Sequence, residues 1–177
     1  MAVEDGVVYD VLLDGLKQIL NDSGGPFPRD RQIDITFDSV GDESPLNQLS
    51  QMLQTRDGTK HYPKCLIVYE GATIDPNFAA GEQVEDAQIN IWFGVSSSSN
   101  RRALTGNGSP NWGVLGIQKW VMNLLNMDTH GTYVIRTPAD RAWIVRGITN
   151  IRLIPNLLAF TAMNRITVIC RLIHDTV

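Results

Sequence analysis

The feature that most constrains the fold is a long alternation of apolar and polar residues between Gln83 and Val95. Successive side chains of a β-strand point to opposite faces, so this period of two predicts a strand with one buried face. The residues on that face are Ala87, Ile89, Ile91, Phe93 and Val95. Trp92 falls on the opposite face, so we expect that a helix of the same chain or a second subunit covers it.

Four further segments are predicted as strands. The compact run from Lys64 to Glu70 is rich in β-branched and apolar residues, which is typical of a strand buried on both faces. Weaker patterns predict short strands at residues 31–38 and 133–135. The chain closes with strands at 142–153 and 158–173, and the short connection through Ile154, Pro155 and Asn156 indicates an antiparallel pair. Gly147 is predicted to mark a β-bulge.

Three helices are predicted from apolar residues that recur every three or four positions. They cover Val7–Leu20, a short segment that Ser44 caps, and Trp112–Met127, for which Asn111 or Ser109 is the predicted cap. Residues 72–81 and the stretch Ser96–Pro110 are predicted as loops. The second loop is rich in Ser, Gly and Asn, and loops of this length in compact domains often carry function.

These elements predict an α+β fold: a mixed, mostly antiparallel sheet with flanking helices, in a single domain over residues 1–177. The chain is 43% hydrophobic, which is enough to form a core, and its two cysteines do not suggest a disulfide framework. We expect no secretory signal, because the first six residues are acidic and no basic and apolar regions follow the signal-peptide pattern. We expect no membrane contact, because no apolar stretch approaches the roughly 20 residues that span a bilayer.

Sequence motifs for catalysis are absent: there is no phosphate-binding loop, nucleophile elbow or zinc-binding pattern. Gly106–Gly108 is interpreted as a flexible loop tip. We therefore predict no catalytic residue, no cofactor and no metal. A thiol enzyme based on Cys65 or Cys170 stays open as an alternative, although buried cysteines in strands usually act as small apolar residues. Paired carboxylates such as Glu85 and Asp86 are interpreted as a solvated rim.

Recognition of another molecule is the remaining class of function. The net charge of −4 argues against a broad nucleic-acid-binding face. Arg101 and Arg102 form a basic pair in the long loop, which could dock on an acidic partner surface. These two arginines are the candidate partner contacts, and Trp92 is the candidate for packing between subunits.

The order of these elements resembles that of the tail terminator proteins of contractile-tailed phages, including those of Mu-like prophages. The resemblance covers nearly the whole chain. The segments that carry it are the helix Val7–Leu20, the strands Pro63–Gly71 and Ala87–Phe93, the Ser/Asn/Arg loop, the helix opening Gly113–Ile117 and the closing antiparallel pair. It departs from the family in the long Arg29–Asp42 region and in Ser96–Pro110, which would be partner-specific insertions.

The resemblance implies a homohexameric ring that caps the tail tube, stops polymerisation and presents a docking surface to the neck. The implied partners are the tail tube protein, the sheath protein and the head-completion protein. DNA would pass through the lumen without specific binding. The implied location is the virion, and the host cytoplasm during assembly. The alternatives are another head–tail joining protein, the thiol enzyme, and a ligand-binding domain with Ser96–Pro110 as a lid.

Overall fold

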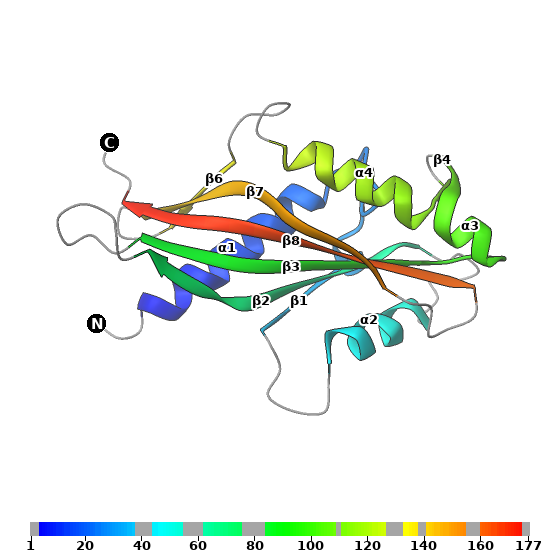
Figure 1. The fold of residues 1–177 in the computed structure, drawn as a ribbon, viewed down its shortest axis with the longest axis horizontal. Coiled ribbons are helices and arrows are strands. Elements are labelled where there is room, and N and C mark those ends of the chain that lie inside the picture. The colour runs from blue at the N-terminus through cyan, green and yellow to red at the C-terminus, as the bar shows by residue number, and fades with distance from the viewer. Residues whose placement is uncertain are drawn as a thin grey trace.

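A six-stranded sheet forms the centre of the computed structural model (Figure 1). The structure describes residues 4–37, 44–54, 62–75, 84–108, 111–126, 133–137, 141–154 and 160–174. The strand order is β1-β2-β3-β8-β7-β6, and only the β1–β2 pair is parallel. The strands are β1 (Ile33–Phe37), β2 (Lys64–Asp75), β3 (Val84–Ser96), β6 (Val134–Thr137), β7 (Arg141–Ile154) and β8 (Thr161–His174). The predicted α+β fold with a mixed, mostly antiparallel sheet is thereby confirmed.

The helices lie on both faces of this sheet. Helices α1 (Glu4–Leu20) and α4 (Val114–Leu124) pack on what we call the core face, the face that carries Ile89, Ile91 and Phe93. Helix α2 (Pro45–Gln54) packs on the opposite, outer face. Helix α3 (Asn100–Thr105) adds Ala103 to the core-face cluster. A separate two-stranded ribbon joins β4 (Gly106–Gly108) to β5 (Asn111–Trp112).

Burial on the core face confirms the main elements predicted from the sequence. All five residues predicted on the apolar side of β3 are buried, and so are both faces of β2 from Cys65 to Val68. Helix α1 presents Leu12, Leu13, Leu16 and Leu20 to this core, each fully buried. The indole N–H of Trp143 donates a hydrogen bond of 2.9 Å to the Val8 carbonyl, which ties α1 to β7.

The outer face is only partly covered. Helix α2 buries one end of it through Leu49 and Leu53, which pack against Met163 of β8. Its start is capped as predicted, because the Asn47 amide donates to the Ser44 hydroxyl at 3.2 Å. Beyond α2, the outer face carries polar pairs, including the buried Thr167 hydroxyl that donates to the Asn90 side-chain oxygen at 2.7 Å. This pair satisfies polar groups that would otherwise be costly to bury.

The predicted loop at Ser96–Pro110 contains α3 and β4, and this prediction was therefore wrong. Ser99 begins the helix, since its hydroxyl accepts from the Arg102 amide at 3.2 Å. Gly106 has a positive φ of 63° and lies against the backbone of Gly113, so a Cβ at either position would clash with main-chain atoms. Gly106–Gly108 is thus a paired strand and not a loop tip. These short elements give weak periodic signals, because few of their residues face the core.

Several predicted boundaries also shift. Helix α4 is shorter than predicted and begins after Gly113, so neither Asn111 nor Ser109 caps it. Strand β2 continues through Gly71 to Asp75, into residues predicted as loop. The predicted bulge at Gly147 is confirmed by its φ of 142° and by a register shift between Val145 and Gly147. The predicted connection at residues 154–156 lies largely outside the described residues.

Replacement of Leu16 by alanine tests the contribution of α1 to the core. Leu16 is fully buried, so the Leu16→Ala variant should lose about 2–5 kcal/mol of unfolding free energy in urea titrations. The matched control is Leu115→Ala, because Leu115 is 42% exposed on α4 and its loss should change stability by no more than about 0.5 kcal/mol. Equal losses in the two variants would contradict this packing.

Candidate assembly interface

Two strands of the sheet extend beyond their outer neighbours. β1 pairs with β2 only along Cys65–Tyr69, and β6 pairs with β7 only along Arg141–Ile144. Among the described residues, no strand pairs with the outer edge of β2 from Glu70 to Asp75, nor with that of β7 from Arg146 to Ile154. We call these segments the β2 half-edge and the β7 half-edge. Each one presents backbone N–H and C=O groups that can pair with another chain.

The two half-edges lie at diagonally opposite corners of the sheet. β2, β3, β8 and β7 form successive antiparallel pairs, so β2 and β7 run in opposite directions. The half-edges are the C-terminal parts of these two strands, and they therefore point to opposite ends of the molecule (Figure 1). Each half-edge also exposes a large apolar side chain: Ile74 is 58% exposed and Leu153 is 51% exposed.

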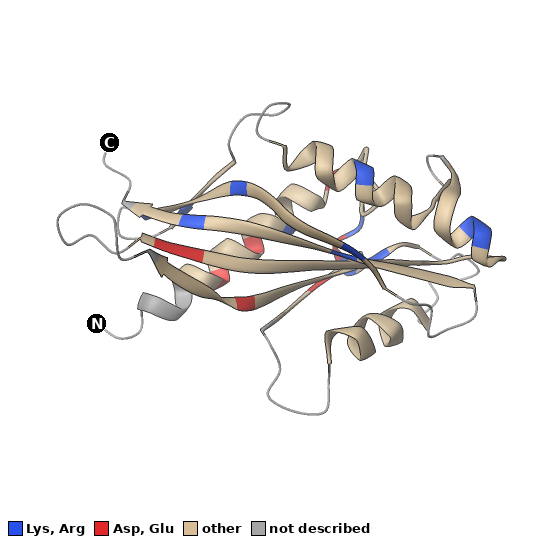
Figure 2. Ribbon diagram, viewed as in Figure 1, with Lys and Arg blue, Asp and Glu red and all other residues tan. Residues whose placement is uncertain are grey.

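The half-edges differ in charge. Strand β7 contains three arginines and no acidic residue, and Arg146 and Arg152 of its half-edge are exposed. The β2 half-edge presents the exposed carboxylate of Glu70. Figure 2 shows basic residues on β7, β8, α3 and α4, and acidic residues on β2 and β3. Helix α1 carries residues of both signs, and β2 also begins with Lys64. The sheet therefore changes from acidic to basic across its width.

The two acidic residues Glu85 and Asp86 of β3 have partners within the chain. Arg171 donates two hydrogen bonds of 2.7 Å to the Asp86 carboxylate, and these bonds lower the pKa of Asp86 despite partial burial. The Tyr9 hydroxyl donates to Glu85, and burial together with this bond raises the pKa of Tyr9. Within the described ranges, Glu70 has no hydrogen-bond or ion-pair partner of this kind. Its charge is thus available to another molecule.

A groove of about 450 Å³ adjoins the β7 half-edge. It lies between the C-terminal end of α4 and the bulged part of β7. Its lining includes Met122, Leu125, Arg146, Gly147 and Ile148. Apolar side chains on both walls, with one arginine at the rim, can accept an apolar side chain from a strand added to this edge.

Trp92 lies on the outer face, where it packs beside the cluster of Leu49, Leu53 and Met163. The guanidinium of Arg165 lies over its ring at 5.5 Å from the centroid. A helix of the same chain thus covers part of Trp92, as one of the two sequence interpretations expected. The indole N–H is buried and finds no acceptor in the part of the chain that the structure describes. A role for Trp92 in packing between subunits stays a prediction.

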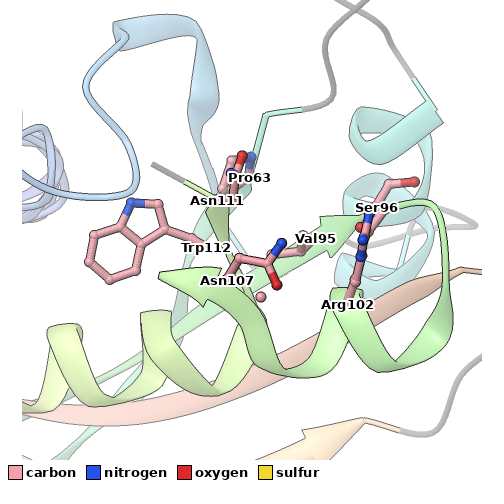
Figure 3. Close-up of a pocket in the computed structure, with 9 residues that line it drawn as sticks. Pro63, Val95, Ser96, Arg102, Asn107, Asn111 and Trp112 are labelled. Atoms are coloured by element: carbon pink, nitrogen blue, oxygen red, sulfur yellow. The ribbon is translucent and has the colours of Figure 1, made fainter. Parts of the chain in front are cut away.

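Arg101 and Arg102 are both exposed on α3. The Arg102 guanidinium donates to the Ser98 hydroxyl at 3.4 Å and lines a polar recess of about 210 Å³. Figure 3 shows Arg102 beside Ser96 on one side of this recess and Trp112 on the other. The predicted contact pair is therefore held on a capped helix next to a concave surface. None of the residues that line this recess belongs to either half-edge.

Both cysteines are buried in strands, as predicted. Burial raises the pKa of the Cys65 thiol well above its ordinary value, and it raises the pKa of Cys170 to about 12. Such thiols are protonated near neutral pH, whereas a nucleophilic cysteine must form a thiolate. Within the described residues, no three His, Cys, Asp or Glu side chains converge as ligands for a metal ion.

Comparison of the sequence with models of known protein families and with curated proteins finds no match. None of the helices in the described ranges is both long enough and apolar enough to cross a membrane.

Glu70, Ile74, Arg146 and Arg152 are interface candidates that the sequence patterns did not identify. The only signal for them was the excess of arginine over acid in residues 141–154. These residues lie on open edges only because the pairing of β1 and β6 does not reach them, and the sequence does not reveal how far that pairing extends.

Thiol labelling tests the burial of both cysteines. In native protein at pH 8, Cys65 and Cys170 should react with a maleimide at least roughly a hundredfold more slowly than in guanidinium chloride, where both become accessible. The readout is the labelling rate by mass spectrometry. Fast labelling of either cysteine in the native protein would instead support the thiol enzyme.

Proposed function

We propose that this protein is a phage tail terminator, which assembles into a ring, caps the tail tube and stops its growth. The observation that carries the proposal is the pair of half-edges, which are different in sequence and opposite in charge. A ring needs a heterologous interface, in which one patch of a subunit meets a different patch of its neighbour. Two unlike and complementary edges on one sheet meet that requirement.

The proposed mechanism is recognition by shape and charge. One face of the ring would match the last ring of the tube, while the other face offers no template for a further tube subunit. The exposed Arg101 and Arg102, on α3 beside the polar recess, are the proposed contacts with tube, sheath or neck proteins. The α+β fold agrees with the order of elements on which the resemblance to the tail terminators rests.

The net negative charge of the chain is compatible with a ring whose lumen lets DNA pass. A net charge of −4 gives a ring a negative overall potential. Exposed Asp10 and Asp14 on α1 contribute to this potential. Repulsion of phosphate would let DNA pass through a lumen without binding to its wall. The proposed hexamer comes from the resemblance alone.

Removal of this gene from the phage that encodes it tests the proposal. The lysate should contain overlong tails of irregular length, because nothing stops tube polymerisation. Electron microscopy of negatively stained particles gives the length distribution. Re-expression of the wild-type chain should restore the uniform length, which is the matched control.

A different phenotype would contradict the terminator function. Tails of normal length that are not attached to heads would instead identify a head–tail joining protein. Particles indistinguishable from wild type would exclude an essential role in the tail.

A further inference from the structure

We propose that subunits join by sheet extension: the β2 half-edge of one copy adds as an antiparallel strand to the β7 half-edge of the next copy. This inference rests on the proposed ring and specifies its contacts. Both half-edges present backbone groups that no described strand pairs with, and addition of a strand to an open edge is a common mode of recognition. The result is one sheet that continues from subunit to subunit.

The strand direction follows from the topology. β2 and β7 run in opposite directions within one copy. A neighbour that is moved sideways across the strands and turned by a fixed angle therefore places its β2 antiparallel to the β7 of the first copy. No copy needs to be inverted, so the same contact repeats around a closed ring.

Side-chain chemistry favours the same direction. The antiparallel alignment places Glu70 toward the Arg152 end of the β7 half-edge. It also places Ile74 toward Ile148 and the groove beside Met122. An exposed carboxylate thus meets an exposed arginine, and the 58% exposed Ile74 meets the groove. Opposite charges across two strands attract each other, and burial of Ile74 removes apolar surface from water.

Pairing of two β7 half-edges is disfavoured. Two β7 half-edges would bring Arg146 and Arg152 against each other, and like charges across strands are destabilising. The half-edges also carry irregularities that limit pairing with an unmatched strand: β7 has register shifts at Val145/Gly147 and Ile148/Asn150, and β2 has one at Tyr69/Gly71. These features favour a second copy, through its other edge, as the occupant.

Disulfide trapping between copies tests the contact. Thr73→Cys lies on the β2 half-edge and Asn150→Cys lies on the β7 half-edge, and both native residues are exposed. Each single variant should stay uncross-linked under mild oxidation, while an equimolar mixture should form disulfide-linked dimers. The double variant should form a ladder of oligomers on a non-reducing gel. The native cysteines do not compete, because both are fully buried.

A matched control is Gln88→Cys, which is exposed but lies on the central strand β3 and should not cross-link with Asn150→Cys. Trapping accumulates transient contacts, so it also detects weak assembly. Absence of mixed dimers at the highest soluble concentration would overturn the inference. So would self-cross-linking of a single variant at a rate equal to that of the mixture.

Charge reversal in the same assay tests the proposed ion pair. Glu70→Arg in the Thr73→Cys partner should slow cross-linking roughly tenfold, and Arg152→Glu in the Asn150→Cys partner should do the same. The two reversals combined should restore the original rate. Lys119→Glu, an exposed change of equal charge on α4, should leave the rate within about twofold. No rescue by the combined reversals would overturn the pairing of Glu70 with Arg152.

The two proposals can fail separately. Overlong tails in the deletion phage without trapped dimers would retain the terminator function and reject sheet extension. Trapped dimers with tails of normal length would support the contact between copies and reject the terminator function.

Discussion

The ladder between β3 and β8 runs from the Glu85–Leu172 pair to the Ser96–Thr161 pair, and the other elements are arranged around it. These two long strands bring the apolar residues of both onto the core face, where α1 and α4 bury them. β2 and β7 extend the ladder on each side with strands of similar length. The outermost strands, β1 and β6, are much shorter, so among the described residues the sheet is paired on both sides at its centre and is open at two corners.

In the proposed assembly, the two half-edges can bind a neighbouring copy because their backbone groups are not paired by a described strand. Longer β1 and β6 strands would cover both half-edges and leave only their own outer edges for a neighbour. Here the open corners have opposite charge, which favours repetition of one contact over pairing of identical edges. The recess beside Arg102 contains no half-edge residue, so the proposed contacts with other proteins can use a surface separate from the half-edges.

The central strands could be predicted from the sequence because alternation over many residues leaves one consistent arrangement. The strand from Gln83 to Val95 is the clearest case, and the bulge at Gly147 followed from a glycine inside a strand pattern. Helix α3 was not predicted, since it has six residues, two of them arginines, and depends on Ser99 as a cap. The half-edges could not be predicted either. They arise where β1 and β6 end against their neighbours, and such long-range pairing leaves no periodic signal in Glu70 or Arg152.

The close approach of Gly106 and Gly113 has a mechanical consequence. With no side chain between them, the backbone that follows α3 lies directly against the backbone that precedes α4. Ala103 and Ile117 then anchor both helices in the same core. A force applied at Arg101 would therefore be transmitted to the core of the subunit, because the segment between α3 and α4 leaves little room for bending. A protein bound to α3 would then be held rigidly relative to the sheet.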